Sequence, residues 1–223
     1  MERITTLKLG LLIAGLVLSL PALALNGQAA AGQAASAICT ACHQPDGNGM
    51  NIPGGESWPR LAGLDAKYIY KQLQDFKAGS RTSPTMTPFA TMLTDQQMRD
   101  LAVYYSQMQP GKAANAGASA ELLAQGEKLA TYGDWDRYLV PCASCHGPNN
   151  QGAGEHFPGI AGQHAGYIES QLLSWQKQER KNDPQQLMLA IAERMTPEDI
   201  KAIAAWLATQ PAQGPSAANT AAR

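Results

Sequence analysis

The sequence predicts an all-α protein made of two tandem helical domains. Three observations lead to this prediction: the chain contains an internal duplication, each repeat carries apolar residues at helical spacing behind capping residues, and alternating strand patterns bounded by turns are absent. A chain of 223 residues is long enough for two small domains. Repeats of about 90 residues have the size of domains rather than of solenoid units.

Composition and charge narrow the possible classes of function. The 17 Lys and Arg residues nearly balance the 18 Asp and Glu residues, and charged residues make up 16% of the chain, against about 25% in an average soluble domain. This balance excludes a general nucleic-acid binder, which needs a basic surface to match phosphate. Aromatic residues make up only 6% of the chain, so we expect a bound group to help fill the two cores.

Residues 1–24 are interpreted as a signal peptide rather than as part of the fold. Arg3 and Lys8 give a positive start, Leu9 to Leu20 form an apolar run, and Ala22-Leu23-Ala24 has the pattern of a cleavage site. The run of 12 residues is too short to span a hydrocarbon layer of about 30 Å as a helix. We therefore expect an exported, periplasmic chain with no membrane span after cleavage; a retained anchor is the alternative.

All four cysteines fall in two C-x-x-C-H pentapeptides, Cys39-Thr40-Ala41-Cys42-His43 and Cys142-Ala143-Ser144-Cys145-His146. This pattern is the attachment signature of c-type haem. The two thiols add to the haem vinyl groups as thioethers, and the following histidine can then be the proximal iron ligand. The sequence therefore predicts two covalently attached haem c groups, with Cys39, Cys42, Cys142 and Cys145 as attachment residues and His43 and His146 as iron ligands.

Three other interpretations of the cysteines are weaker. A zinc site could use two C-x-x-C pairs, but these pairs lie 103 residues apart, and zinc would not require a histidine after each. A thioredoxin-like redox motif would normally occur once, near a βαβ pattern that is absent here. Two local disulfides, which export would permit, would leave both histidines unexplained.

Two helices are predicted after the first pentapeptide. Between residues 65 and 77, Ile69, Leu73 and Phe76 recur at the spacing of one helix face. Residues 95–107 show a similar stripe, and Thr94 with Gln97 forms a capping box that opens this helix.

The second repeat contains the same segments in the same order. Thr196 caps the last helix, with Pro197 at its first position, where no amide is missed. Arg81 corresponds to Arg180. The longer matches are Trp58-Pro59-Arg60-Leu61-Ala62-Gly63 with Phe157-Pro158-Gly159-Ile160-Ala161-Gly162, and Tyr68-Ile69-x-x-Gln72-Leu73 with Tyr167-Ile168-x-x-Gln171-Leu172.

These matches define the predicted domain organisation. The Ala- and Gly-rich stretch between the repeats is typical of a flexible linker, and the chain ends in a small-residue stretch predicted to be disordered. The predicted units are a signal peptide (1–24), a first domain (25–110), a linker (111–119), a second domain (120–211) and a tail (212–223).

Met86 and Met188 are the candidates for the second axial ligands. Each precedes the capping threonine of its last helix by eight residues, and they follow the proximal histidines by 43 and 42 residues. No other register places a methionine in both repeats. The alternative is that both side chains pack in the core, since methionine fills gaps well. A thioether on the loop before the last helix could instead close over the open haem face.

With these motifs the sequence resembles the cytochrome c4 family of periplasmic dihaem electron carriers, from about residue 32 to 211. The resemblance implies two cytochrome c domains related by a pseudo-twofold axis, with the haem edges facing each other. It implies His/Met ligation at both irons. It also implies that the carbonyls of Pro59 and Pro158 accept hydrogen bonds from the proximal imidazoles, which orients the rings.

The repeats differ before the second pentapeptide. Gly32 lies seven residues before Cys39, whereas its counterpart Gly126 lies sixteen before Cys142. The extra residues fall within 131–140 and include Tyr132, Trp135 and Tyr138. They either pack locally over the haem or form a docking patch, because exposed Tyr and Trp are favoured at interfaces. The remaining histidines, His156 and His164, are interpreted as loop residues.

The main functional prediction is a respiratory-chain carrier that passes single electrons between a donor and a terminal oxidase or other acceptor, and is not an enzyme. Two axial protein ligands leave no vacant iron site for a substrate, and methionine ligation raises the haem potential. Its partners would be a membrane oxidase or reductase, with no nucleic acid involved. The alternative is the cytochrome subunit of a periplasmic sulfide, thiosulfate or alcohol dehydrogenase. A haem enzyme is a third hypothesis, disfavoured by the two methionines.

Overall fold

The computed structural model describes residues 25–112 and 117–214. The predicted signal peptide, the middle of the predicted linker and the end of the predicted tail lie outside the described residues. Within these two ranges the regular structure is helical, with three isolated bridges and no β-strand. The all-α prediction is therefore confirmed.

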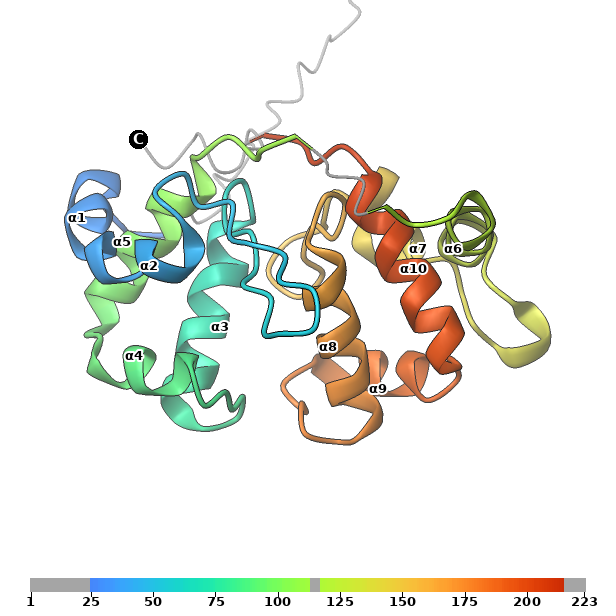
Figure 1. The fold of residues 1–223 in the computed structure, drawn as a ribbon. Helices are drawn as coiled ribbons and strands as arrows, with labels where there is room; N and C mark the ends of the chain where they lie inside the picture. The colour runs from blue at the N-terminus through green and yellow to red at the C-terminus, as the bar shows by residue number, and fades with distance from the viewer. Residues whose placement is uncertain (1–24, 113–116, 215–223) are drawn as a thin grey trace, which may run out of the picture.

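The two ranges form two halves that lie side by side (Figure 1). The first half, residues 25–112, contains α1 (Ala29–Ala35), η1 (Ser36–Ile38), α2 (Thr40–His43), α3 (Ala66–Ala78), α4 (Met86–Met92) and α5 (Asp95–Ser106). The second half, residues 117–214, contains α6 (Ala120–Tyr132), η2 (Trp135–Arg137), α7 (Ala143–His146), η3 (Pro148–Asn150), α8 (Ala165–Gln176), η4 (Pro184–Gln186), α9 (Leu187–Ala192) and α10 (Pro197–Thr209).

The longer helices begin where their capping residues stand in the sequence. Asp65 accepts hydrogen bonds from the amides of Lys67 and Tyr68 at the start of α3. Thr94 and Gln97 form the predicted capping box of α5. Thr196 caps α10 in the same way, with Asp199 as its reciprocal partner. These caps satisfy first-turn amides that have no partner within the helix.

In each half the first helix crosses the last one at a glycine. A β-carbon on Gly32 of α1 would lie 2.1 Å from the carbonyl oxygen of Asp100 in α5, and one on Gly126 of α6 would lie 2.0 Å from that of Ala202 in α10. Only a residue without a side chain allows this approach. The duplication seen in the sequence is thus a duplication of helix packing.

Each half has its own apolar core. The first cluster is built around Leu64, Ile69 and Leu101, and the second around Leu172, Ile203 and Leu207. Neither cluster of buried residues includes a member from the other half. Separate cores are the mark of separate domains, in agreement with two tandem helical domains.

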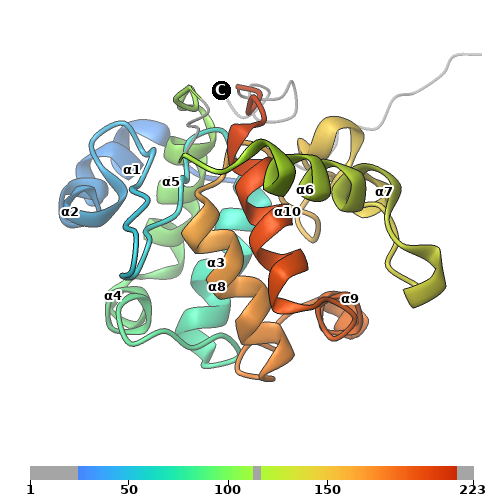
Figure 2. The same cartoon turned by 45° about the vertical axis from the view of Figure 1, so that its right-hand side comes forward.

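The halves meet through polar contacts around α3 and α8, which lie next to each other in both views (Figures 1 and 2). The side chain of Gln163 accepts from the amide of Arg60 at 2.8 Å and donates to its carbonyl at 2.9 Å. Arg60 also reaches the carbonyl of Ala161 at 3.1 Å. None of the helices in the described ranges is long and apolar enough to cross a membrane.

Candidate cofactor-binding sites

Each C-x-x-C-H pentapeptide forms one helical turn. The amide of His43 donates to the carbonyl of Cys39 at 2.9 Å, and the amide of His146 donates to that of Cys142 at 2.9 Å. Residues three and four apart on a helix share a face, so both cysteines and the histidine of each motif lie on one side. The chain then turns away through positive φ angles at Gln44 and Gly147.

Both proximal histidines are buried and oriented by a proline carbonyl. Nδ1 of His43 lies 2.9 Å from the carbonyl oxygen of Pro59, and Nδ1 of His146 lies 2.7 Å from that of Pro158. Nδ1 is therefore the protonated nitrogen in each ring, since a carbonyl can only accept. Burial lowers the pKa of both rings, which keeps Nε2 deprotonated and able to bind a metal.

Cys39 and Cys142, the first cysteines of the two pairs, do not have the character of redox-active thiols. Burial raises the pKa of Cys39, and it raises that of Cys142 to about 11. Reactive thiols have lowered pKa values instead. All four cysteines lie in the described ranges, and none forms a disulfide there. Both observations run against the thioredoxin-like and disulfide interpretations.

Met86 and Met188 start short helices rather than lying on loops, so the predicted loop placement is wrong. Met86 is the first residue of α4, and its amide donates to Oγ of Ser83 at 3.0 Å. Met188 is the second residue of α9, and its amide donates to Oδ2 of Asp183 at 2.7 Å. The loops before these helices fold back so that a polar side chain satisfies a first-turn amide.

One continuous cavity of about 920 Å³ joins the two motifs. It is lined by both cysteine pairs, both proximal histidines, and Met86 and Met188. Met92 and Met195 also reach the lining, but the side chain of Met92 is 68% exposed and Met195 belongs to the core cluster of the second half. The register match between the repeats still singles out Met86 and Met188.

The residues present fit a c-type haem. Nε2 of His43 is buried and has no hydrogen-bond partner among the described residues, although a buried ring nitrogen normally finds one. It lines a largely apolar cavity beside two thiols. An apolar ring system with a metal at its centre would provide a metal for Nε2 of His43 to bind and would fill the apolar cavity.

The two other histidines differ from each other. His156 is exposed in a turn, with Nε2 3.1 Å from a carboxylate oxygen of Glu155, as expected for a loop residue. His164 precedes α8 and is half-buried, and its Nε2 lies 2.7 Å from the carbonyl oxygen of Asn48 in the first half. The loop interpretation therefore missed a contact between the halves.

Sequence reasoning also missed the role of the paired arginines. Arg81 and Arg180 were identified only as matching positions, yet both are buried and line the cavity where the halves meet. The only sign of this role in the sequence is that each arginine follows a repeated Tyr-Ile-x-x-Gln-Leu segment at a similar distance. The sequence does not show that each arginine contacts residues of the other repeat.

The insertion, residues 131–140, comprises the last two residues of α6 and a firmly held loop after it; we call this segment the aromatic loop. Asp134 and Leu139 pair through two backbone hydrogen bonds, and Leu139 is 1% exposed. Arg137 bridges Asp134 at 2.7 Å and Asp199 of α10 at 2.6 Å. The aromatic side chains project outward, with exposed fractions of 68% for Tyr132, 65% for Trp135 and 75% for Tyr138. This exposure does not fit the prediction of packing over the haem.

Comparison with known proteins gives consistent matches. The family model for cytochrome c matches residues 29–109 and 124–211. A thiosulfate dehydrogenase electron acceptor of Stutzerimonas stutzeri strain A1501 is 40% identical over 88% of this chain and 91% of that protein. Cytochrome c4 of Thiocapsa roseopersicina is 41% identical over 81% of this chain and 92% of that protein. The crystal structure of reduced recombinant cytochrome c4 from Pseudomonas stutzeri is similar with a TM-score of 0.74 and 35% identity, over 82% of this chain and 99% of that chain.

Proposed function

This chain belongs to the cytochrome c family and, within it, to the dihaem cytochromes c4, and from that premise we propose how its residues hold and use the two haems. Two covalent haem c groups and dihaem electron transfer follow from the family. The residue assignments, the periplasmic location and the absence of an enzymatic activity are our proposal.

One observation carries the proposal: the same site occurs twice around one cavity. Each copy contains a cysteine pair on a helical turn, a buried imidazole oriented by a proline carbonyl, and a methionine at the start of a short helix. Cys39 and Cys42 attach the first haem, and Cys142 and Cys145 attach the second. His43 and Met86 would bind the iron of the first haem, and His146 and Met188 would bind that of the second.

The chemistry supplied by each bound haem is the gain or loss of one electron at its iron. The chain would bind this iron through one imidazole and one thioether, a ligand pair that favours the ferrous state relative to two imidazoles. The Pro59 and Pro158 carbonyls fix each imidazole so that its Nε2 faces the cavity. With an imidazole and a thioether bound to each iron, no ligand position would remain for a substrate, and the protein would carry electrons instead of catalysing a reaction.

The axial assignment is tested by replacing Met86 or Met188 with Ala. Each change should abolish about half of the near-infrared sulfur-to-iron charge-transfer absorbance and open that haem to carbon monoxide. Met92→Leu is the matched control on α4, because its exposed side chain should leave the band intact. A full band after either alanine change, or a wild-type haem that binds carbon monoxide readily, would favour a haem enzyme.

A second, more specific function is electron acceptance from a thiosulfate-oxidising dehydrogenase of the periplasm. The relative named for that role suggests the class of donor, and the exposed aromatic loop offers a surface for it. Tyr and Trp are enriched in the centres of protein interfaces. Tyr138 lies four residues before Cys142, so its Cα lies within about 14 Å of the attachment site.

This second candidate is tested by the rate at which a thiosulfate dehydrogenase reduces the protein in stopped-flow measurements. Trp135→Ala together with Tyr138→Ala should lower the second-order rate constant at least tenfold, as expected for loss of an interface centre. Met50→Ala is the control, since Met50 is also exposed but lies in the first half and does not line the cavity. Equal rates for the wild type and the double variant would exclude the aromatic loop as the docking surface.

A further inference from the structure

The aromatic loop carries the only exposed Tyr, Trp or Phe side chains among the described residues. Tyr132, Trp135 and Tyr138 are each at least 65% exposed and lie within one stretch of seven residues. In both views the segment between α6 and α7 projects from the side of the second half that faces away from the first half (Figures 1 and 2). Exposed apolar side chains gathered in one place mark an interaction surface.

Tyr138 is held in a backbone conformation that a tyrosine rarely adopts. Its φ of 55° and ψ of 31° lie in the left-handed region, which suits glycine and is unusual for a bulky residue. Its side chain is 75% exposed, so packing within the fold does not explain why a tyrosine stands at this position. Backbone strain of this kind clusters where a side chain serves function.

The half that carries this loop is acidic. Residues 117–214 contain 7 Lys and Arg residues against 11 Asp and Glu residues, whereas residues 25–112 contain 7 against 6. Beside the loop lies a hollow of about 410 Å³, and its charged lining residues are Lys128, Asp134, Asp136, Arg137 and Asp199. Arg137 pairs with Asp134 and Asp199. Asp136 is exposed and forms no ion pair within the described ranges.

Aromatic rings beside an unpaired carboxylate suit a cation, and above all a guanidinium group. The faces of Trp and Tyr rings attract cations, and the planar guanidinium stacks on such rings. A carboxylate can accept two hydrogen bonds from the same group. The excess of negative charge on this half would repel an acidic partner and attract a basic one.

We propose that the aromatic loop docks a basic protein surface, whose arginine side chains stack on Trp135 and Tyr138 and pair with Asp136. The inference rests on the proposed use of this loop for docking a redox partner, and it adds the chemistry of that partner. Association is then fast at low salt and slows as salt screens the charges. Such a partner binds the second half, because the first half has neither the loop nor the excess of negative charge.

The first test is calorimetric titration of the holoprotein with a hexa-arginine peptide, with a hexaglutamate peptide as the reference that should not bind. Replacing both Trp135 and Tyr138 with Ala keeps the net charge, so we expect the loss of stacking alone to weaken binding about threefold or more. Asp136→Asn should weaken binding more than Glu121→Gln does. Glu121→Gln is the matched control, because it removes the same charge from an exposed position about 16 Å before Tyr132 along α6.

A second variant, Tyr138→Gly, separates docking from folding. Glycine adopts the left-handed conformation without strain, so the melting temperature of the holoprotein should not fall, whereas its affinity for the hexa-arginine peptide should. A lower melting temperature with unchanged affinity would mean that Tyr138 supports the fold and does not bind the partner.

Two further results would overturn the inference: an alanine double variant that binds the peptide as tightly as the wild type, or equal losses for Asp136→Asn and Glu121→Gln. The rate of reduction by a thiosulfate dehydrogenase separates the inference from the proposed function. A rate that the alanine double variant lowers but salt leaves unchanged would leave the proposed docking standing and overturn the basic partner. No reduction of the wild type would remove that donor, and the peptide titration would still decide the inference.

Discussion

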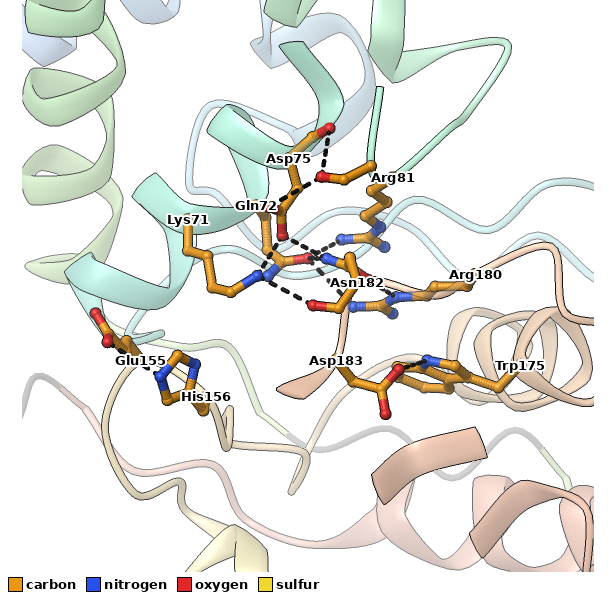
Figure 3. A network of polar contacts seen from close by, with 11 residues as sticks. Lys71, Gln72, Asp75, Arg81, Glu155, His156, Trp175, Arg180, Asn182 and Asp183 are labelled. Carbon is orange, nitrogen blue, oxygen red and sulfur yellow. Dashed lines mark hydrogen bonds and ion pairs between the residues drawn. The ribbon is translucent and has the colours of Figure 1, made fainter. Parts of the chain in front are cut away.

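At the scale of single residues, the two sites differ in the side chain that positions the distal methionine. Oγ of Ser83 accepts from the amide of Met86, whereas a carboxylate oxygen of Asp183 accepts from the amide of Met188. The other oxygen of Asp183 accepts from the indole of Trp175 at 3.1 Å (Figure 3). Asp183 thereby ties the start of α9 to α8, a support that is absent from the Ser83 contact.

Replacing Asp183 with Ala should therefore weaken the hold on Met188. The Met188 amide and the Trp175 indole would each lose their acceptor, at a cost of about 1–3 kcal/mol for a buried unsatisfied group. We expect a smaller near-infrared sulfur-to-iron band and partial binding of carbon monoxide. Asp183→Asn should give an intermediate band, because its single amide oxygen can accept from the Met188 amide or from the Trp175 indole but not replace both carboxylate oxygens. An intact band in Asp183→Ala would show that Met188 needs no such support.

At the scale of secondary-structure elements, the crossings of α1 with α5 and of α6 with α10 decide how each half closes. Gly126 lies where α6 passes over the backbone of α10, and its missing side chain permits the approach. On an open helix surface, changing Gly to Ala stabilises by about 0.4–1 kcal/mol. At Gly126 the added methyl group would collide with the backbone of α10, so the same substitution should destabilise the protein.

Gly126→Ala is thus expected to destabilise the protein by about 1–3 kcal/mol, the usual cost of overpacking. Thermal unfolding followed by circular dichroism would measure it. Glu127→Ala is the control, because this exposed neighbour on α6 should change stability by no more than about 0.5 kcal/mol. Equal or higher stability of Gly126→Ala would contradict the close crossing.

At the scale of the whole molecule, His164 makes the contact between the halves sensitive to pH. Its Nε2 donates to the carbonyl of Asn48, and burial lowers its pKa below the ordinary value of about 6.5. The unfolded chain therefore takes up this proton more readily than the folded one. The stability that depends on neutral His164 is complete above about pH 6.5 and is lost as the pH falls below that value.

The wild type should accordingly lose thermal stability relative to His164→Gln as the pH is lowered from 7.5 to 5. The glutamine amide can still donate to the Asn48 carbonyl, but it does not titrate. The measurement is the difference between the two melting temperatures across this range. A difference that stays constant with pH would mean that His164 does not titrate on unfolding.

The separate cores of the two halves lead to a prediction about haem loading. Replacing both Cys142 and Cys145 with Ala should remove the second haem and leave the first attached, because the first core contains no buried residue from the second half. The haem-to-protein ratio should fall by half, and the α1–α5 half should remain helical by circular dichroism. Loss of both haems would show that the halves do not fold independently.

The sequence by itself determined the features that depend on neighbouring residues. The C-x-x-C-H motifs and the caps at Thr94 and Thr196 were readable because their chemistry lies within one or two helical turns. The duplication was readable because the same segments recur in the same order. The equivalence of Met86 and Met188 was readable because each lies eight residues before the capping threonine of the last helix in its repeat. The helical start at Met188 was not readable, because the first turn of α9 depends on the hydrogen bond from the Met188 amide to the side chain of Asp183.

Only the tertiary structure decided how the two halves meet. The contacts of Arg81 with Gln171, of Arg60 with Gln163 and of His164 with Asn48 join residues separated by 90, 103 and 116 positions. No local periodicity or motif encodes such pairs, because they depend on the relative placement of two folded domains. The outward projection of Trp135 and Tyr138 was decided in the same way, by the bridge from Arg137 to Asp199 on a helix far along the chain.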